Sequence, residues 1–461
     1  METIQPPNTA VVVVPFPAQG HLNQLLHLSR LLAGYNLPIH IITTTTHGRQ
    51  VKTRIHGWNP LSIHFHHYPT DHFDSPPPDP TATVKFPDHL IPSFKSAMHL
   101  RQPFVDLLST LSSAAKRVVV IHDYLMSTVV QDAVSYTNVE TYMFTCCSAF
   151  TSFWYNWEST GRPSLDGELQ SILKELPSNE DCMSTDGLQF ILSIDVSYKR
   201  FSSGMILDSC RVIEGKYIDL LEQEEARDHQ KLWALGPFNP VAITRDSSPN
   251  RHKLFDWLDK QASNSVLYVS FGTTTSISNE QIQELAMGLE QSEQRFIWVL
   301  RDADKGDIFD GEVRKIELPK GFEERVGENG LVVVDWVPQP EILGHPATGG
   351  FMSHCGWNSS TESITMGVPV AAWPMHSDQP RNAMLITKVL NIGIYVRDWT
   401  RREELISSTV VEEAVRKLMA SEEGEEMRKR AAELGGRVRR SVEDGGVRRI
   451  ELDSFVGHIT R

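Results

Sequence analysis

Residues 349–362 carry the pattern that most restricts the fold of this chain. Gly349–Met352 is an apolar run that opens with two glycines, and it is predicted to be a short strand. The polar segment Ser353–Trp357 follows as a tight turn, and Asn358–Glu362 is typical of the first turn of a helix. Ser359 and Glu362 have the spacing of a capping box, which predicts that the helix starts here.

A strand that leads through a turn into a helix N-terminus is suited to bind an anion. The first backbone N–H groups of a helix have no intrahelical acceptor, and the helix dipole is positive at that end. A second predicted strand, Val368–Trp373, ends in the polar loop Pro374–Gln379. In open α/β sheets, ligands bind beyond the carboxyl ends of the strands, where both loops would lie. The pattern therefore predicts a site for a nucleotide diphosphate.

The whole stretch Trp336–Gln379 resembles, without a gap, the signature segment of plant UDP-sugar-dependent glycosyltransferases. The resemblance implies that Trp336 stacks on uracil, Gln339 bonds the edge of the base and Glu362 bonds the ribose. Each role suits the chemistry of its side chain. From the residues alone, Trp336 could instead belong to the core, and Glu362 could serve only as the capping partner of Ser359.

The resemblance also assigns residues to the rest of the donor. The expected diphosphate ligands are His354, Asn358 and Ser359. The expected sugar contacts are Trp357, Asp378 and Gln379. By a weaker likeness, Thr275 in the polar turn after Phe271 is expected to touch phosphate.

Strands and helices alternate in both halves of the chain. Ala10–Phe16 is an all-apolar strand, leucines at helical spacing follow it, and Pro38–Thr44 is the next strand. The pattern restarts with a strand at Ser265–Phe271 and a helix at Gln281–Glu290. Such alternation produces parallel sheets, so we expect an α/β fold with two successive domains. The resemblance implies the GT-B fold, in which two Rossmann-like domains face each other across a cleft.

The expected acceptor-binding domain spans residues 1–238, and the expected UDP-sugar-binding domain spans 252–445. Between them, residues 239–251 form a polar stretch with Pro and Ser that is typical of a linker. The resemblance implies that the last helix, at about 446–461, returns to pack on the first domain. The charge-rich segment 412–440 is predicted to be the solvated face of a helix.

Two residues of the first half have the properties of a catalytic pair. His21 follows the first strand at the start of a helix, and Asp123 follows the predicted strand Val118–Ile121. Both would lie at one edge of a parallel sheet, where a carboxylate can orient an imidazole base. The helix dipole is expected to lower the pKa of His21 and favour its neutral form. The resemblance supports this pair, since PFPAQGHLNQLL and VVVIHDYL are similar to the family segments with the catalytic His and Asp.

The expected reaction is an inverting sugar transfer. His21 would take the proton of an acceptor hydroxyl, and the oxygen would attack the anomeric carbon opposite UDP. The UDP-sugar is a co-substrate, and no cofactor or metal is expected because protein groups would neutralise the diphosphate. Asp302 and Asp304 form an Asp-x-Asp sequence, which is interpreted as a solvated loop and not as a metal bridge.

The composition excludes several partners. A formal net charge of −14 argues against a nucleic-acid backbone as a ligand. No window approaches the ~20 apolar residues that a bilayer crossing requires, and the N-terminus lacks the pattern of a signal peptide. The five cysteines, an odd number without C-x-x-C spacing, indicate reduced thiols. We therefore expect a cytoplasmic protein, and a monomer.

Four segments resemble one group within the family, the zeatin O-glycosyltransferases: GHLNQLLHLSRLL, FGTTTSIS, ESITMGVP and WPMHSDQPRNA. This implies a small hydroxylated acceptor of the zeatin type and UDP-glucose or UDP-xylose as donor. Gln379 suggests glucose, but xylose lacks only one exocyclic group and is hard to exclude. Flavonoids and other phenols or alcohols are alternative acceptors, because the resemblance is weakest between about 71 and 180, where the acceptor pocket would form.

Three other classes of protein explain less of the sequence. An NAD-dependent oxidoreductase would need a G-x-G-x-x-G turn, whereas the first turn here is PFPAQGH. A glycoside hydrolase would need two facing carboxylates, and no pair is marked by its position. A non-catalytic binder of nucleotide sugars or hormones would not need both His21 and Asp123.

Overall fold

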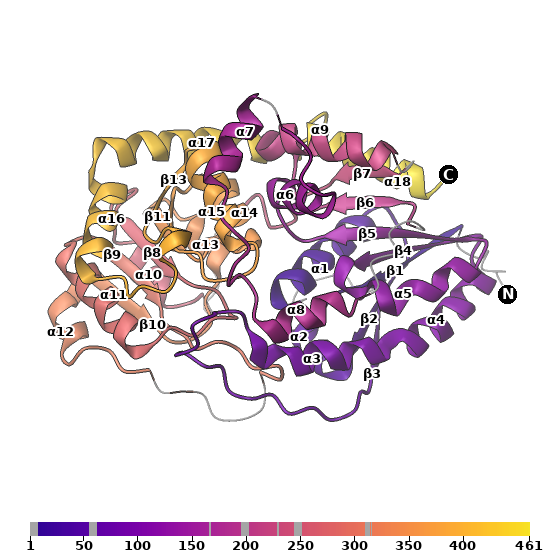
Figure 1. The fold of residues 1–461 in the computed structure, drawn as a ribbon, viewed down its shortest axis with the longest axis horizontal. Coiled ribbons are helices and arrows are strands. Elements are labelled where there is room, and N and C mark those ends of the chain that lie inside the picture. The colour runs from indigo at the N-terminus through magenta and orange to yellow at the C-terminus, as the bar shows by residue number, and fades with distance from the viewer. Residues whose placement is uncertain are drawn as a thin grey trace.

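The chain folds into two lobes that lie side by side (Figure 1). The computed structural model describes residues 8–54, 62–165, 167–194, 202–227, 230–243, 251–308, 314 and 316–461. Within these residues the first lobe has a sheet of seven strands and the second a sheet of six, and all pairings are parallel. The structure confirms the predicted α/β class with two successive units.

The first lobe contains most of the first half of the chain. Its strands are β1 (Thr9–Val14), β2 (Ile39–Thr44), β3 (Ile63–Tyr68), β4 (Arg117–Asp123), β5 (Val139–Thr145), β6 (Gly204–Leu207) and β7 (Lys231–Ala234). Its helices are α1 (Gln19–Ala33), α2 (Thr45–Arg54), α3 (Ile91–Ala97), α4 (Arg101–Ala114), α5 (Ser127–Val130), α6 (Ala149–Ser159), α7 (Gly167–Glu175), α8 (Thr185–Leu192) and α9 (Arg211–Arg227). The last helix of the chain, α18 (Val447–Ile459), also packs on this lobe.

The second lobe follows without returning to the first sheet. Its strands are β8 (Val266–Ser270), β9 (Arg295–Val299), β10 (Gly330–Val333), β11 (Thr348–Ser353), β12 (Val370–Ala372) and β13 (Gly393–Tyr395). Its helices are α10 (Leu254–Leu258), α11 (Asn279–Gln291), α12 (Phe322–Val326), α13 (Gln339–Leu343), α14 (Trp357–Met366), α15 (Gln379–Met384), α16 (Ser408–Ala420) and α17 (Glu422–Ser441).

The two sheets share one strand order. The first runs β3-β2-β1-β4-β5-β6-β7 and the second runs β10-β9-β8-β11-β12-β13. In each sheet the order reverses once, between β1 and β4 and between β8 and β11. This is the Rossmann order, and ligands bind at the carboxyl end of such a reversal because the connections leave it in opposite directions.

Strand β1 shows why the first sheet forms where the sequence predicts it. All of its residues are buried. Val11 and Val13 pack on one side of the sheet with Leu22 of α1, whereas Val12 packs on the other side with Phe104 of α4. Because helices cover both faces, the strand is apolar throughout instead of alternating with polar residues.

The end of the chain crosses from the second lobe back to the first. Helix α17 runs from the second lobe towards the first, and α18 then lies beside β7 (Figure 1). Phe455 of α18 is fully buried. Its ring centroid lies 5.4 Å from that of Tyr142 and 5.1 Å from that of Trp233, both in the first sheet. The last helix therefore completes the core of the first lobe.

The charge-rich segment 412–440 corrects one prediction. It belongs to two helices, α16 and α17, which Ser421 separates. The Ser421 Oγ caps the second helix by accepting the Gly424 N–H at 3.0 Å. Both helices bury an apolar stripe, which includes Val415 and Met427, so only their outer faces are solvated.

Two further predictions concern the linker between the lobes and a crossing of the membrane. The predicted linker 239–251 includes residues 244–250, which lie outside the described residues. Across the helices that the structure does describe, none has the length and apolarity that a bilayer crossing requires.

Replacing Phe455 by alanine is expected to lower the free energy of unfolding by about 3–5 kcal/mol, because it leaves a cavity in the aromatic core under α18. Denaturant titration monitored by circular dichroism would measure the change. Ile450, on the same helix but 57% exposed, provides the matched control, and I450A should stay within about 0.5 kcal/mol of wild type. Equal stability of the F455A variant and wild type would contradict the docking of α18.

Candidate active site

His21 and Asp123 meet where the strand order of the first sheet reverses. Strand β1 leads into α1, which carries His21, and the neighbouring strand β4 ends at Asp123. The His21 Nδ1–H donates to Asp123 Oδ2 across 2.7 Å. The Asp123 side chain is 1% exposed, whereas that of His21 is 28% exposed. The structure thus brings together the two residues that the sequence predicts as a pair, and it leaves part of the imidazole accessible.

Two further contacts hold this pair in place. Asp123 Oδ1 accepts the Leu125 N–H at 2.9 Å, so both carboxylate oxygens are engaged. The ring of Phe16 meets the ring of His21 edge-on, with 5.3 Å between centroids. A hydrogen on Nδ1 leaves Nε2 as the basic nitrogen of the imidazole.

The pKa of His21 corrects the expectation from the helix dipole. Burial lowers this pKa, but the charge and the hydrogen bond of Asp123 raise it, with a smaller contribution from Asp378. The net pKa lies above the ordinary value of 6.5. A carboxylate in direct contact outweighs a helix dipole, whose effect is usually below about 1 kcal/mol.

The turn between β11 and α14 lies at the corresponding reversal of the second sheet. Cys355 is in the left-handed conformation with φ of 62°, and Gly356 is the N-cap of α14. The helix begins at Trp357, before the predicted cap, so the capping-box prediction is wrong. The Ser359 hydroxyl and the Glu362 carboxylate instead accept hydrogen bonds from a residue outside the helix.

That residue is Gln339, at the start of α13. Its Nε2 donates to Ser359 Oγ at 3.0 Å and to Glu362 Oε2 at 2.7 Å, and its Oε1 accepts from the Tyr268 hydroxyl at 3.2 Å. Burial raises the pKa of Glu362 to about 7, and Gln339 partly opposes this. The three residues predicted to meet the base, phosphate and ribose therefore form one bonded group.

His354 occupies the tightest place of the turn. A Cβ atom on Gly272 would lie 2.7 Å from His354 Nε2, and one on Gly356 would lie 2.5 Å from it. Glycine is therefore required on both sides of this imidazole. Burial lowers the pKa of His354 to about 4, so the ring is neutral at pH 7.

Two buried polar atoms near this turn have no hydrogen-bond partner among the described residues. They are His354 Nδ1 and Thr275 Oγ1, which follow β11 and β8 at adjacent strand ends. Buried polar groups are normally bonded, and an unpaired one costs about 1–3 kcal/mol. Their position at the strand ends indicates a polar ligand that completes them.

Trp336 follows β10 and stands out from the surface. Its side chain is 68% exposed, so it does not belong to the core. This exposure excludes the alternative prediction that Trp336, which follows an apolar run, is a core residue. An exposed indole at the carboxyl end of a strand is free to stack on a planar ring.

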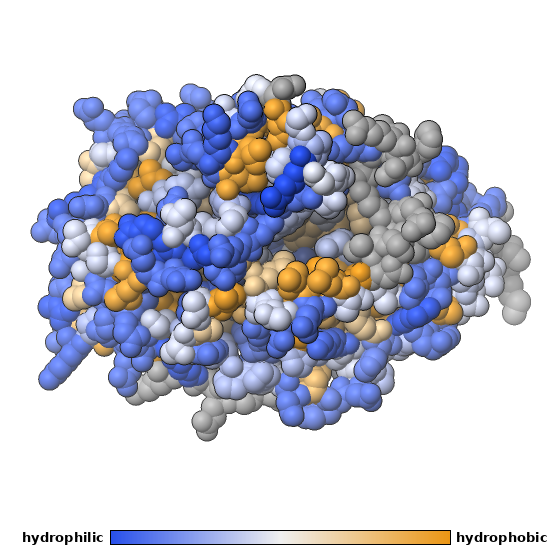
Figure 2. All heavy atoms as spheres, viewed as in Figure 1, coloured by the Kyte–Doolittle hydropathy of each residue, from blue (hydrophilic) through white to orange (hydrophobic). Residues whose placement is uncertain are grey.

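Trp357 and Asn358, at the start of α14, contact the first lobe. The Trp357 Nε1–H donates to the Asp208 carbonyl at 2.6 Å, and the side chain is buried. Its backbone N–H, at the start of the helix, is the group of Trp357 that can bond an acceptor atom of a ligand. Asn358 Nδ2 donates to the Gly20 carbonyl at 2.8 Å, directly before His21. These bonds fix the turn between β11 and α14 against the first lobe, beside His21. Figure 2 shows a hollow near the middle of this face of the molecule.

Asp378 and Gln379 lie at the start of α15. Gln379 Oε1 accepts the N–H groups of Met375 and His376 at 2.9 and 3.1 Å, so this amide shapes its own loop. Asp378 Oδ2 accepts from Asn382 Nδ2 at 2.8 Å. Asn382 was not predicted from the sequence, because two of its partners, Ser148 and Thr151, lie in the other lobe and far away along the chain.

The Asp-x-Asp sequence corrects another prediction. The Asp302 side chain is 6% exposed and accepts from the Ser276 hydroxyl. The Asp304 N–H donates to the Thr273 carbonyl at 2.8 Å, and its carbonyl accepts from His89 Nε2 of the first lobe at 2.9 Å. The segment is therefore not a solvated loop; it holds the turn after β8 and connects the two lobes.

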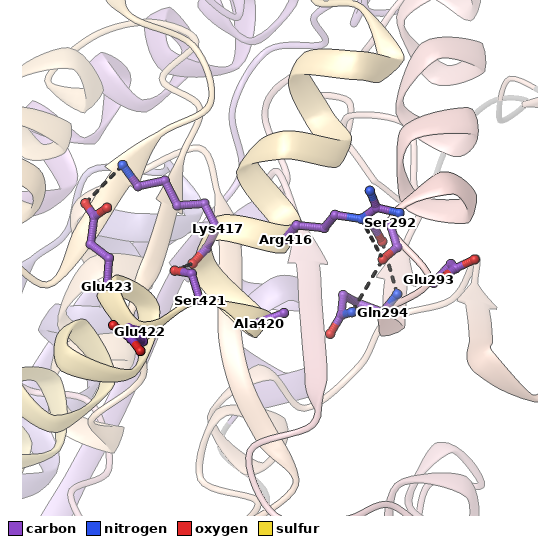
Figure 3. Close-up of a pocket in the computed structure, with 9 residues that line it drawn as sticks. All are labelled: Ser292, Glu293, Gln294, Arg416, Lys417, Ala420, Ser421, Glu422 and Glu423. Carbon is purple, nitrogen blue, oxygen red and sulfur yellow. Dashed lines mark hydrogen bonds and ion pairs between the residues drawn. The ribbon is translucent and has the colours of Figure 1, made fainter.

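A separate cavity of about 660 Å³ lies at the opposite, amino end of the second sheet (Figure 3). Its two basic groups are paired with the protein. Lys417 Nζ lies 3.0 Å from Glu423 Oε1, and Arg416 donates to the Gln291 and Ser292 carbonyls. This arrangement leaves little for a ligand to gain, so we place the active site at the carboxyl ends.

Two parallel-sheet lobes that face each other through their strand reversals have the GT-B fold. The structure of Phytolacca americana UGT2 with UDP-2fluoro-glucose and pterostilbene superimposes with a TM-score of 0.78, at 25% identity, and covers 99% of this chain and 100% of that chain. A family described as "Glycosyltransferase, N-terminal domain" matches residues 7–240, and "UDP-glucoronosyl and UDP-glucosyl transferase" matches 241–428. The chain belongs to the plant family of UDP-glycosyltransferases.

Two curated relatives are similar to almost the whole chain. Zeatin O-glucosyltransferase of Phaseolus lunatus is 54% identical over 461 residues, which are 99% of this chain and 98% of that protein. Zeatin O-xylosyltransferase of Phaseolus vulgaris is 52% identical over 453 residues, which are 98% of each. The similarity to the family therefore extends over both lobes.

The pKa of His21, measured by NMR with histidine-selective labelling, is expected to exceed 6.5. Replacing Asp123 by asparagine removes the raising charge but keeps the burial, so the pKa should fall below 6.5. Asp132, which pairs with Arg101 on the surface of the same lobe, provides the control. D132N should leave His21 unchanged, and an equal effect of both variants would contradict the assigned contact.

Proposed function

We propose that this enzyme is an inverting glycosyltransferase that moves glucose or xylose from a UDP-sugar to the side-chain hydroxyl of a zeatin-type cytokinin. The observation that carries the proposal is the His21–Asp123 pair. The Asn358–Gly20 bond holds this pair against the turn between β11 and α14, where the UDP-sugar would bind. The names of the two curated relatives support the acceptor and both sugars. Flavonoids or other phenols are the second candidate acceptors.

We assign the donor to the second lobe, residues 252–445. Trp336 would stack on uracil, Gln339 would bond the edge of the base, and Glu362 would bond the ribose. The existing bond between Gln339 and Glu362 supports these two roles, because it already orients both groups. The acceptor would bind to the first lobe, residues 1–238 with 446–461, and residues 239–251 would connect the two.

The diphosphate would meet the start of α14. Backbone N–H groups there, with Ser359 and Asn358, would face its oxygens. His354 and Thr275 would donate from the unpaired atoms described above. Asp378 and Gln379 would bond the sugar hydroxyls, and the Trp357 N–H would lie beside them.

In the reaction, His21 Nε2 would take the proton of the acceptor hydroxyl as the hydroxyl oxygen attacks the anomeric carbon. The bond from that carbon to the UDP oxygen breaks on the opposite face, so the configuration inverts. Asp123 would stabilise the imidazolium that forms. The raised pKa of His21 makes it a stronger base, but we expect transfer to slow as the pH falls through that pKa and protonates it.

The departing UDP would gain negative charge at the helix start. Fixed N–H donors aimed at developing charge lower the barrier without rearranging. His354 would act as a neutral hydrogen-bond donor, because its pKa of about 4 keeps it uncharged. These donors can take the role that a divalent metal serves elsewhere, so we propose transfer that persists in EDTA.

The function is tested by incubating the protein with UDP-glucose or UDP-xylose and zeatin, a flavonol or a simple alcohol. The mass of the product identifies the sugar and acceptor, and the anomeric proton coupling in its NMR spectrum identifies the configuration. We expect a β-linked zeatin glycoside. An α-linked product would overturn inversion, and turnover confined to flavonols would overturn the acceptor.

Replacing His21 by alanine is expected to reduce transfer by about 10²–10⁴-fold, because the base is lost. UDP affinity, measured by calorimetry, should stay nearly unchanged, since the donor contacts lie in the other lobe. His27, further along the same helix, offers a control, and H27A should retain transfer. Wild-type rates in H21A would show that another group is the base.

Replacing Trp336 by alanine is expected to weaken UDP binding by about 1–3 kcal/mol through lost stacking. W336F keeps a planar ring and should recover most of the affinity. Because the indole is exposed, the melting temperature without UDP should not change. Val334, also exposed after β10, serves as the control through V334A; equal losses in the two variants would contradict a specific stacking role.

A further inference from the structure

Asn382 is a fully buried side chain that the donor assignment does not use. It lies on α15, after Asp378 and Gln379. Its Nδ2 donates to Asp378 Oδ2 at 2.8 Å and to the Cys355 carbonyl at 3.0 Å. Its Oδ1 accepts from the hydroxyls of Ser148 and Thr151, 2.8 and 3.1 Å away. All four hydrogen-bonding positions of the amide are therefore filled.

The four partners come from three different places. Asp378 opens α15 and is the proposed sugar ligand, and Cys355 belongs to the proposed phosphate turn. Ser148 and Thr151 lie in the first lobe, where Ser148 is the N-cap of α6. The loop before α6 continues from β5, next to β4 and its Asp123. One amide thus joins the two donor-binding segments to the lobe that carries His21.

Other contacts between α15 and α6 strengthen this connection. Arg381 Nη2 donates to Glu158 Oε1 of α6 at 2.8 Å. Its guanidinium lies 4.4 Å from the ring centroid of Tyr155, on the same helix. The Ala149 and Phe150 N–H groups of α6 are held in turn by the Glu214 carboxylate at 3.0 and 2.8 Å. Helix α6 is consequently a fixed support and not a loose surface element.

We propose that Asn382 is a positioning residue with two roles. It orients Asp378 towards the donor sugar, and its bonds with Thr151 and Ser148 hold that sugar at a fixed position relative to the base in the first lobe. The proposal rests on the proposed function, because the sugar and the base are the groups it aligns. An amide is required here. A carboxylate would lose both donated bonds and repel Asp378, and an alkyl group would remove all four bonds of the amide.

The first test separates the two halves of the amide. In N382D, the bonds to Asp378 and to the Cys355 carbonyl are both lost. Loss of the first should remove the affinity that the sugar adds to UDP, whereas loss of the second should weaken both ligands alike. Calorimetry with UDP and with UDP-glucose measures this as the ratio of the two dissociation constants. We expect the UDP constant to change less than about threefold and the UDP-glucose constant to approach it, with transfer reduced roughly 10–100-fold. Equal weakening of both ligands would overturn the role in orienting Asp378.

The second test removes one of the two bonds that Asn382 accepts from the first lobe, the one from Thr151. T151V loses the hydroxyl at almost constant volume, and T151S keeps it. We expect T151V to bind UDP and UDP-glucose like wild type but to lower kcat about tenfold, while T151S restores transfer. T387V is the control, since the Thr387 hydroxyl is also buried but bonds the Ala383 carbonyl within its own lobe. Full kcat in T151V would overturn the role of Asn382 in holding the sugar in place relative to the base.

Melting temperatures distinguish positioning from simple stabilisation. A purely structural role would make transfer follow stability across N382D, T151V, T151S and T387V. Failure of the proposed function would look different, since wild type would then transfer no sugar to any acceptor. In that case the ratio of UDP to UDP-glucose affinity in N382D still decides whether Asn382 orients the sugar ligand.

Discussion

The geometry of the site follows from one constraint: in a parallel sheet, all strands end at the same edge. In both lobes the strand order reverses once, and the connecting segments leave that point in opposite directions. The first lobe places His21 and Asp123 there, and the second places the turn that ends at Gly356. The Asn358–Gly20 and Trp357–Asp208 bonds then join these two edges directly. The topology therefore brings the candidate residues of the two lobes together.

Burial sets the pKa values of several titratable groups at the candidate site. Desolvation keeps His354 neutral and raises the pKa values of Glu362 and Asp378. His21 differs, because a carboxylate in direct contact reverses the effect of burial. The two sides of the crevice thus hold different kinds of imidazole: one strengthened as a base, and one that can only donate or accept a hydrogen bond.

The sequence predicted what depends on neighbouring residues and missed what depends on distant ones. The apolar run at β1, the turn before α14 and the candidate pair of His21 and Asp123 follow from local patterns. The capping box failed because Gln339, remote in sequence, takes the bonds of Ser359 and Glu362. The pKa of His21 was misjudged because the dipole of its own helix is visible in sequence, whereas the distance to Asp123 is not. Asn382 was missed because its bonds with Ser148 and Thr151 exist only once the lobes meet.

The return of α18 has a consequence for hybrid enzymes. Its Phe455 fills a space between Tyr142 and Trp233, so a segment encoded last is part of the core encoded first. A chimera that exchanges whole halves between relatives at one crossover would pair the acceptor lobe of one parent with the closing helix of the other. Side chains that pack against each other in one parent would be separated at that interface. Crossovers on both sides of the donor lobe would keep each lobe with its own packing partners.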